Sequence, residues 1–326
     1  MAVDRVRVGV LGCADIAWRR MLPALAGHAS VEVVAIGSRD AAKAAAFARR
    51  FGGEPVTGYR AVLDRSDVDA VYVPLPPALN AGWTRRALEA DKHVLCEKPL
   101  TTTARQASAL RELARARGRA LFENYMFLCH PQHHLVDELL AAGRIGEVRS
   151  LAAEFTIPGK PADDIRHRRD LDGGALTGVG VYPLRTALRH LGPGLEVAGA
   201  HLNTDPDTGV DTGGAALLTA PGGAVAQIGF GLRHAYRGRY ELTGSRGRIT
   251  VPRAYTPPAD HTAVVRLERD GSREEFLVPP HDQFRSVVTA FAEGVRSGAP
   301  SPLTGEALHD QARLVEDLRA VARRGA

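Results

Sequence analysis

The sequence predicts an α/β protein in which a doubly wound parallel sheet is followed by a mostly antiparallel sheet with helices on one face. In the first third, short apolar runs alternate with helical segments and small-residue turns. After that, β-rich runs follow one another, many of them separated by short Gly, Pro or Asp turns. The length of 326 residues suits two domains, each with its own core. We therefore expect one domain at residues 1–123 and a second at residues 124–326.

The first domain is expected to alternate strand and helix, as parallel sheets require. Its predicted strands are 6–11, 31–36, 68–73, 93–96 and 120–123. Its predicted helices are 14–26, 41–51, 80–90 and 101–117. Gly52 and Gly118 follow two of these helices and are stop signals.

The second domain is expected to be rich in short strands. Its predicted strands are 148–156, 197–202, 214–219, 224–230, 240–242, 248–251, 263–267 and 275–278. Its predicted helices are 131–142, 181–191, 282–296 and 305–323. We find no internal repeat and no low-complexity tail.

The composition is that of an ordinary globular protein, with 44% hydrophobic and 24% charged residues. No run approaches the roughly 18 apolar residues that a membrane span needs, and no signal peptide is evident. The three cysteines lie far apart, which favours reduced thiols in the cytoplasm over disulfides or a zinc site. The net charge of +5 forms no long basic stripe, so we expect neither nucleic acid nor membrane as a partner.

The turn after the first strand has the small residues that a dinucleotide site needs. A G-x-G-x-x-G/A pattern matches at Gly12, Ala14 and Ala17, with alanine at the second glycine. Small residues let a pyrophosphate approach the amino end of the following helix. An ordinary strand–helix turn is the alternative interpretation.

The second predicted strand is followed by Ser38 and Arg39. An acidic residue at the end of this strand would favour NAD, whereas arginine can pair with the 2′-phosphate of NADP. We therefore expect NADP (NADPH). The alternative is that Ser38 caps the next helix and Arg39 lies in solvent.

Lysine is rare in this chain, which makes Lys98 informative. Only four of the 42 basic residues are lysines, and Lys98 follows an apolar strand in the run Glu97-Lys98-Pro99. A compact ammonium with a tunable pKa suits a group that polarises a ketone oxygen or protonates an alkoxide. A structural salt bridge with Glu97 is the alternative. The peptide bond before Pro99 is a candidate for the cis form.

With Glu97-Lys98-Pro99, the chain resembles the Gfo/Idh/MocA oxidoreductases along nearly its whole length. The likeness also rests on the glycine turn and on two later stretches, Gly143 to Val148 and Gly173 to Pro183. Within that family it is most similar to actinomycete dTDP-sugar (NDP-hexose) 3-ketoreductases. Such enzymes use NADPH to reduce the C3 ketone of a dTDP-linked keto-deoxyhexose in deoxysugar and antibiotic biosynthesis.

The resemblance implies which residues bind and react. It implies Lys98 and Tyr182 as catalytic residues, with Tyr182 as proton donor and Lys98 as polariser, although the two roles could be exchanged. It implies the following cofactor contacts: Gly12, Cys13, Ala14, Asp15, Ile16, Ala17, Trp18, Arg19, Ser38, Arg39, Tyr59, Leu75, Asn80, Glu97 and Arg166. It implies the following substrate contacts: Lys98, Asp170, Gly178, Tyr182 and Tyr255. Tyr182 as a core aromatic residue is the alternative.

Three residues depart from the family pattern. Gly178 stands where aspartate is usual, Asn80 replaces a common histidine, and Asp172 replaces a third glycine. Two alternatives therefore stay open: an NAD(P)-dependent enzyme of a free sugar, inositol or diol, and a non-catalytic NADP-binding sensor or partner protein.

Two further expectations concern ligands and assembly. The histidines of the helix predicted at residues 131–142 have a spacing that could suggest a metal, but we expect none, since helix-surface histidines are common. Because an open sheet presents unpaired edges, we expect a homodimer or homotetramer.

Overall fold

The computed structural model describes residues 5–324. By their contacts, these residues divide into two compact units. Among the described residues, the first unit comprises 5–101, 105–129 and 283–308, and the second comprises 102–104, 130–282 and 309–324. The proposed boundary between residues 123 and 124 remains a prediction. The contacts add that residues 283–308 pack with the first unit.

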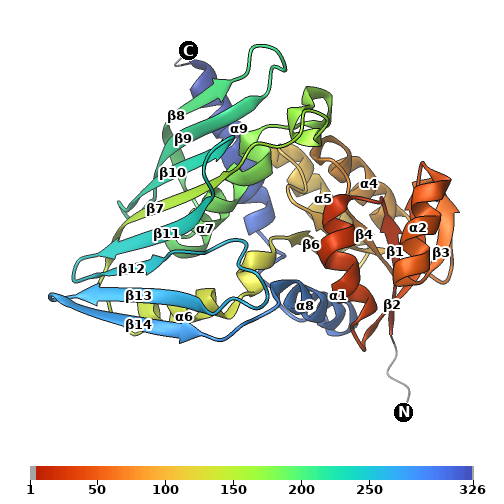
Figure 1. The fold of residues 1–326 in the computed structure, drawn as a ribbon, viewed down its shortest axis with the longest axis horizontal. Coiled ribbons are helices and arrows are strands. Elements are labelled where there is room, and N and C mark those ends of the chain that lie inside the picture. The colour runs from red at the N-terminus through yellow and green to blue at the C-terminus, as the bar shows by residue number, and fades with distance from the viewer. Residues whose placement is uncertain (1–4, 325–326) are drawn as a thin grey trace. The chain divides into compact units, whose positions relative to one another are not determined.

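The first unit is built on a parallel sheet of six strands in the order β3-β2-β1-β4-β5-β6 (Figure 1). Its strands are β1 (Val6–Leu11), β2 (Val31–Ser38), β3 (Glu54–Thr57), β4 (Ala70–Val73), β5 (His93–Glu97) and β6 (Leu121–Asn124). Its helical segments are η1 (Ala17–Met21), α1 (Leu22–Ala26), α2 (Ala41–Phe51), α3 (Tyr59–Leu63), α4 (Pro77–Glu89), α5 (Ala104–Ala116), η2 (Met126–Cys129) and α8 (Gln283–Ser297). The doubly wound parallel sheet is confirmed.

Continuous burial explains why the central strands read as unbroken apolar runs. Every residue of β4 is buried, as are four consecutive residues at the end of β1. A parallel sheet covered on both faces requires this pattern, because neither side of the strand meets water.

The second unit is built on a sheet of eight strands in the order β14-β13-β12-β11-β7-β10-β9-β8. Its strands are β7 (Val148–Ile157), β8 (Glu196–Thr204), β9 (Asp211–Thr219), β10 (Val225–Leu232), β11 (Arg237–Gly244), β12 (Arg248–Val251), β13 (Ala263–Arg269) and β14 (Ser272–Val278). Its helical segments are α6 (Pro131–Ala141), η3 (Ile165–His167), η4 (Arg169–Leu171), η5 (Leu176–Gly180), α7 (Val181–Leu191) and most of α9 (Ala307–Arg324). All pairs are antiparallel except β7 with β10, which confirms the mostly antiparallel sheet.

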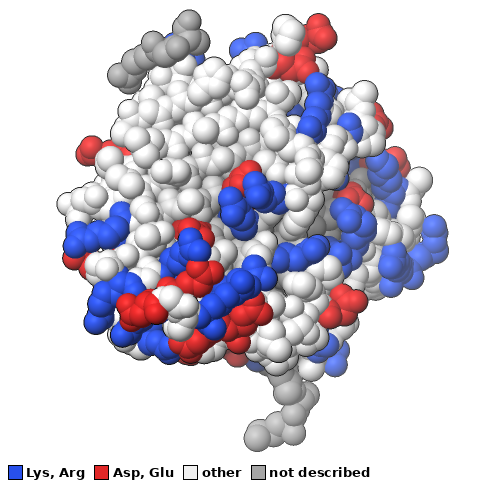
Figure 2. Space-filling view, turned by 60° about the vertical axis from the view of Figure 1, so that its left-hand side comes forward, with Lys and Arg blue, Asp and Glu red and all other residues white. Residues whose placement is uncertain are grey.

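One face of this sheet is covered by helices, and the other is open. Helix α7 packs on β7 and β10, and α6 packs on β13. The open face carries small and uncharged residues over β9 and β10, among them Ala215, Leu217 and Gly229. Arg–Glu pairs crowd the β11 to β14 half, such as Arg248 with Glu268 and Arg266 with Glu275. Figure 2 shows a broad uncharged area beside clustered blue and red side chains.

The structure differs from the predicted elements in several places. Strand β3 and helix α3 were not among the predicted elements. The helix expected at 14–26 contains a π-helical stretch, η1, and a second π-helical stretch, η5, precedes α7. Helix α5 begins at Ala104, three residues later than expected. Within residues 5–324, no helix is both long and apolar enough to cross a membrane.

Candidate functional site

The glycine turn lies at the carboxyl edge of the parallel sheet. Gly12 has φ +127°, and a Cβ atom there would lie 2.9 Å from Leu75 Cδ2 and 3.4 Å from the Pro74 oxygen. The position therefore requires glycine. Because the first helix starts a few residues later, its amino end lies at this edge, where a pyrophosphate is stabilised in dinucleotide-binding proteins. Small residues and a helix terminus fit a dinucleotide. Leu75 lies beside Gly12, and its contact with a cofactor stays a prediction.

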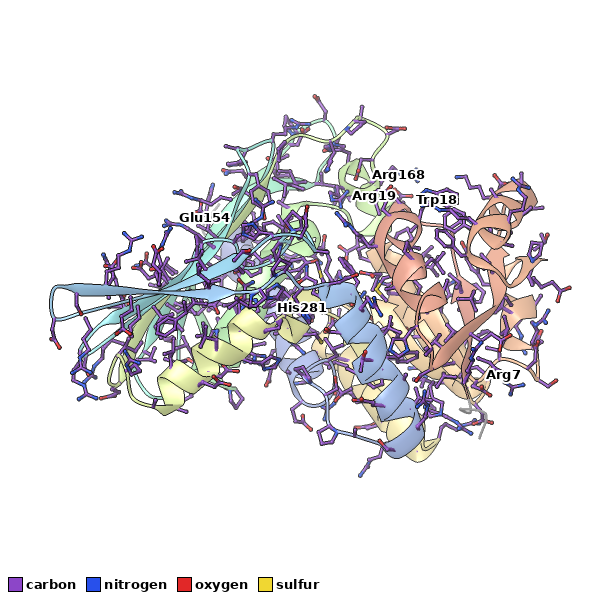
Figure 3. The ribbon with its side chains drawn as sticks, turned by 60° about the horizontal axis from the view of Figure 1, so that its bottom comes forward. Arg7, Trp18, Arg19, Glu154, Arg168 and His281 are labelled. Atoms are coloured by element: carbon purple, nitrogen blue, oxygen red, sulfur yellow. The ribbon has the colours of Figure 1, made fainter. Side chains whose placement is uncertain are left out.

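Two predicted cofactor residues on the first helix are engaged within the first unit (Figure 3). The Trp18 ring packs 4.8 Å from that of Phe47, and the Arg50 guanidinium lies 4.4 Å over the indole. The Arg19 Nε atom donates to Asp15 one turn earlier at 2.8 Å. The side chain of Trp18 thus joins the first helix to α2, and Arg19 and Asp15 neutralise each other. Their contact with a cofactor remains a prediction.

At the end of β2, the structure contradicts the interpretation in which Ser38 caps the next helix. Asp40 caps α2, because its Oδ1 atom accepts hydrogen bonds from the backbone nitrogens of Ala42 and Lys43. Ser38 Oγ accepts from the Asp40 nitrogen at 3.1 Å, so Ser38 as the helix cap is wrong. Arg39 is exposed, and within residues 5–324 no carboxylate pairs with it. Because Arg39 is exposed and Asp40 Oδ1 caps α2, the end of this strand favours recognition of a phosphate over ribose hydroxyls.

Two other predicted cofactor residues lie near this turn. Burial raises the pKa of the Cys13 thiol, so the thiol stays protonated at neutral pH. Tyr59 is buried and packs edge-on against Trp83, with 5.0 Å between ring centroids. Their direct contact with a cofactor stays a prediction, as it does for Ala14, Ile16 and Ala17.

Asn80 holds the backbone on both sides of Lys98. Strand β5 ends at Glu97, and the Lys98–Pro99 peptide bond is cis, as expected. The Asn80 amide is fully buried and donates to the Glu97 oxygen at 3.0 Å and to the Pro99 oxygen at 2.8 Å. The lysine therefore leaves the carboxyl end of a central strand from a backbone fixed by two directional bonds. Sequence reasoning gave Asn80 only a cofactor contact and missed this positioning role.

The Glu97 side chain holds the same segment through hydrogen bonds. Its Oε1 atom accepts hydrogen bonds from the Tyr72 hydroxyl at 2.8 Å and from Asn124 Nδ2 at 2.7 Å. Burial raises the pKa of the Glu97 carboxyl, and its hydrogen bonds oppose that change. The Leu100 nitrogen is held by Glu123 Oε1 at 2.8 Å. The Glu-Lys-Pro segment is thus a rigid feature of the carboxyl edge of the sheet.

Tyr182 lies in the second unit at the start of α7 and is held by packing. Its ring lies 5.1 Å from that of Phe155 and 5.6 Å from that of Tyr255. Thr186 Oγ1 donates to the backbone carbonyl oxygen of Tyr182 at 3.0 Å and, at 3.2 Å, to the Tyr255 hydroxyl. Tyr182 is 6% exposed, and Tyr255 is fully buried. The structure thus brings together Tyr182 and Tyr255, which were both predicted to contact the substrate.

The remaining predicted residues of the second unit fall into two places. A Cβ atom on Gly178 would lie 3.7 Å from Arg166 Cδ, so these two residues are neighbours. The Arg166 guanidinium bonds to Asp164 at 2.9 Å. Asp170 is exposed and pairs with Arg168, which lowers the pKa of the Asp170 carboxyl. Asp170 as a substrate contact stays a prediction.

Asp211 organises the glycine segment before Tyr182 and was not anticipated from the sequence. Its Oδ2 atom accepts from the Leu176 nitrogen at 2.6 Å. Gly174 has φ +117°, and a Cβ atom there would lie 2.2 Å from Asp211 Oδ1. The second glycine of the pair is needed because the Asp211 carboxylate occupies the space beside it. The contact joins residues 35 or more positions apart, so only the glycine pair gave a signal in the sequence.

His133 in α6 and His130, which precedes this helix, make structural hydrogen bonds. His133 is buried between the Tyr240 hydroxyl and the Ala254 oxygen, each 2.9 Å from a ring nitrogen. The His130 side chain caps α6 by accepting from the Gln132 nitrogen. Within residues 5–324, no three His, Cys, Asp or Glu side chains form a group able to hold a metal.

A parallel sheet with a glycine turn, a helix terminus and a positioned lysine at its carboxyl edge defines a dinucleotide-dependent oxidoreductase architecture. Residues 6–125 match the family model of the Gfo/Idh/MocA oxidoreductases with an NAD-binding Rossmann fold, and residues 133–250 match that family's C-terminal domain. The chain belongs to the Gfo/Idh/MocA oxidoreductase family.

Three relatives are similar along nearly the whole chain. The dTDP-3,4-didehydro-2,6-dideoxy-alpha-D-glucose 3-reductase of Actinomadura kijaniata is 54% identical, over 98% of this chain and 96% of that protein. The enzyme of the same name from Saccharopolyspora spinosa is 53% identical, over 98% of both chains. The crystal structure of the 3-ketoreductase KijD10 from Actinomadura kijaniata with NADP and TDP-benzene has a TM-score of 0.93 at 53% identity, covering 97% of this chain and 98% of that one.

Proposed function

We propose that the protein is an NADPH-dependent 3-ketoreductase of a dTDP-linked keto-deoxyhexose, acting in deoxysugar and antibiotic biosynthesis. The observation that carries the proposal is the identity of 54% with a dTDP-3,4-didehydro-2,6-dideoxy-alpha-D-glucose 3-reductase over 98% of the chain. The retained Lys98 and Tyr182 supply the polar groups that ketone reduction needs. The substrate we expect is the one in that relative's name.

Binding of NADPH is supported by the carboxyl edge of the first unit. Gly12 and the helix after it would hold the pyrophosphate, and Arg39 would pair with the 2′-phosphate. Asp40 Oδ1 caps α2 by accepting two hydrogen bonds, so this oxygen is already engaged within the protein. The cofactor, when bound, supplies the hydride, and the protein supplies orientation and charge.

We assign Lys98 to polarise the ketone oxygen and Tyr182 to donate the proton. The Lys98 ammonium projects from a backbone that Asn80 fixes, so little reorganisation is needed as negative charge develops. A phenol held by Phe155 and Tyr255 can donate its proton to an alkoxide. The reaction requires both groups to reach the same oxygen.

The test is turnover of dTDP-3,4-didehydro-2,6-dideoxy-α-D-glucose with NADPH, measured as the loss of NADPH absorbance. Consumption of NADPH with formation of a C3 hydroxyl supports the proposal. Oxidation of free sugars, inositol or diols in its place would favour the first alternative enzyme. Tight NADPH binding with no turnover of any of these compounds would identify a non-catalytic protein.

We further propose a cytoplasmic homodimer or homotetramer. The three cysteines are free thiols, which suits a reducing compartment. The open sheet face is uncharged over β9 and β10, with Leu217 42% exposed, and a second copy of the chain would cover it. Light scattering during size-exclusion chromatography would report the number of copies.

A further inference from the structure

A cavity lies at the edge of the parallel sheet where the strands begin, opposite the carboxyl edge that carries Gly12 and Lys98. It has a volume of about 750 Å³ and is bounded by the starts of β5 and β6, the end of α5 and the end of α8. His93 begins β5 and lines this cavity, whereas Glu97 ends β5 at the Gly12 and Lys98 edge. The cavity and the proposed cofactor site are therefore at opposite ends of the same strands.

Two hydrogen-bond donors face each other in this cavity. The Ala120 backbone nitrogen donates to His93 Nδ1 at 3.0 Å, so in the neutral ring the proton is on Nε2. Arg119 Nη1 lies 3.3 Å from that Nε2 atom, and a guanidinium has only donors. The two groups cannot bond to each other, but both can donate to one acceptor placed between them.

Neither Arg119 nor Arg115, which also lines the cavity, forms an ion pair with a carboxylate of residues 5–324. The Arg119 Nε atom is buried without a hydrogen-bond partner. Glu306 at the rim is bonded to Arg111, which leaves Glu112 as the opposing charge among the lining residues. Burial, followed by the charge of Arg119, lowers the pKa of His93, which keeps its ring neutral at pH 7.

One part of the lining is apolar. Leu121 and Phe122 from β6, Val295 from α8 and Leu308 from α9 contribute to it. A cavity with two convergent donors on an apolar lining, and of this volume, is typical of sites for small organic ligands.

We propose that this cavity is a second ligand site, which binds a small phosphate-bearing molecule. A phosphate oxygen accepts from His93 Nε2–H and from the Arg119 guanidinium, and the organic part of the ligand lies against Val295 and Pro300. The site is separate from the proposed reaction and does not depend on it.

The test uses the full-length protein saturated with NADPH, so that the cofactor site is filled. Inorganic phosphate and phenyl phosphate are titrated by calorimetry at constant ionic strength. Arg119→Gln removes the charge. His93→Asn removes the Nε2 donor. Its amide oxygen takes the place of Nδ1 and can still accept the hydrogen bond from the Ala120 backbone nitrogen. Arg117→Gln is the matched control, since Arg117 pairs with Asp91 and does not line the cavity.

We expect the wild type to bind both probes, and phenyl phosphate more tightly because of the apolar lining. Arg119→Gln should weaken each by at least about tenfold and His93→Asn by several-fold. Arg117→Gln should leave both within about twofold. Equal affinity for the two probes would identify free phosphate as the ligand. No binding by the wild type, or equal losses in Arg117→Gln and Arg119→Gln, would overturn the proposal. If Arg119→Gln does not fold, the comparison of His93→Asn with Arg117→Gln decides.

Discussion

The two units position their reactive side chains by different physical means. The Lys98 segment is held by hydrogen bonds from Asn80 to the Glu97 and Pro99 carbonyls. Tyr182 is held by ring packing against Phe155 and Tyr255. Directional bonds fix a backbone tightly but leave buried polar groups unsatisfied when one partner is lost. Aromatic packing tolerates small changes in polarity, so we expect the two units to respond differently to mutation and to pH.

Two buried titratable groups, Glu97 in the first unit and His190 in the second, have opposite pH dependence. Burial raises the pKa of Glu97 in the first unit, so its contribution to stability is present at low pH and is lost as the pH rises through the folded-state pKa. In the second unit, burial lowers the pKa of His130 to about 4 and that of His190 to about 3. Those histidines reduce stability as the pH falls below the unfolded value of about 6.5.

The strongest test of the comparison replaces the reactive groups themselves. Lys98→Met should lower kcat by about 10²- to 10⁴-fold while NADPH binding stays nearly unchanged, since the ammonium acts mainly on the developing alkoxide. Steady-state kinetics and a fluorescence titration of NADPH measure the two effects. Tyr182→Phe is the paired variant, and a larger loss of kcat there would make the tyrosine more important to catalysis. Full activity of Lys98→Met would refute our assignment of this lysine.

A second test addresses the acid sensitivity of the second unit. His190 is buried on the Tyr240 ring, and Asp137 close to it is already paired with Arg189 at 2.6 Å. Between pH 6.5 and 4.5 its titration should cost the wild type about 2 kcal/mol of unfolding free energy. His190→Leu should lose that part of the pH dependence in urea unfolding measured across this range. The exposed His201→Leu is the control and should keep the wild-type slope. Identical slopes in all three proteins would contradict the expectation.

The polar support of the first unit is tested at Asn80. Asn80→Leu keeps the approximate volume but leaves the Glu97 and Pro99 carbonyls without their donor, which should cost about 1–3 kcal/mol of stability. We also expect kcat to fall more than KM changes, because the Lys98 backbone loses its fixed geometry. Urea unfolding and steady-state kinetics report the two effects. A fall in stability with unchanged kcat would show that Asn80 is only structural.

The smallest expected effect concerns cofactor choice. Arg39→Ala should weaken NADPH about tenfold and leave NADH nearly unchanged, since only NADPH has the phosphate that the guanidinium would meet. Arg49→Ala, another exposed arginine and near the end of α2, is the control. Equal losses for both cofactors would mean that Arg39 does not recognise the 2′-phosphate.

Local signals made much of the fold predictable, whereas distant contacts were hidden. Strands β1, β4 and β5 were evident because burial on both faces leaves unbroken apolar runs. The glycine turn and the Glu-Lys-Pro segment were evident because few residues suit a tight turn or a strand end of this kind. The support of Lys98 by Asn80, and of Gly174 by Asp211, joins residues far apart in the chain. The π-helical stretches η1 and η5 give no distinct periodicity in so few residues, so they were read as ordinary helix or loop.

Helix α8 has a consequence for modular exchange of the nucleotide-binding half. Phe291 packs edge-on against Phe122 of β6 at 5.3 Å, and Gly294 faces the same ring so closely that a methyl group would not fit. A fragment cut after residue 129 would leave this aromatic surface uncovered. A chimera that borrows this half from a homologue must therefore take two separate pieces of gene, and the second encodes residues 283–308.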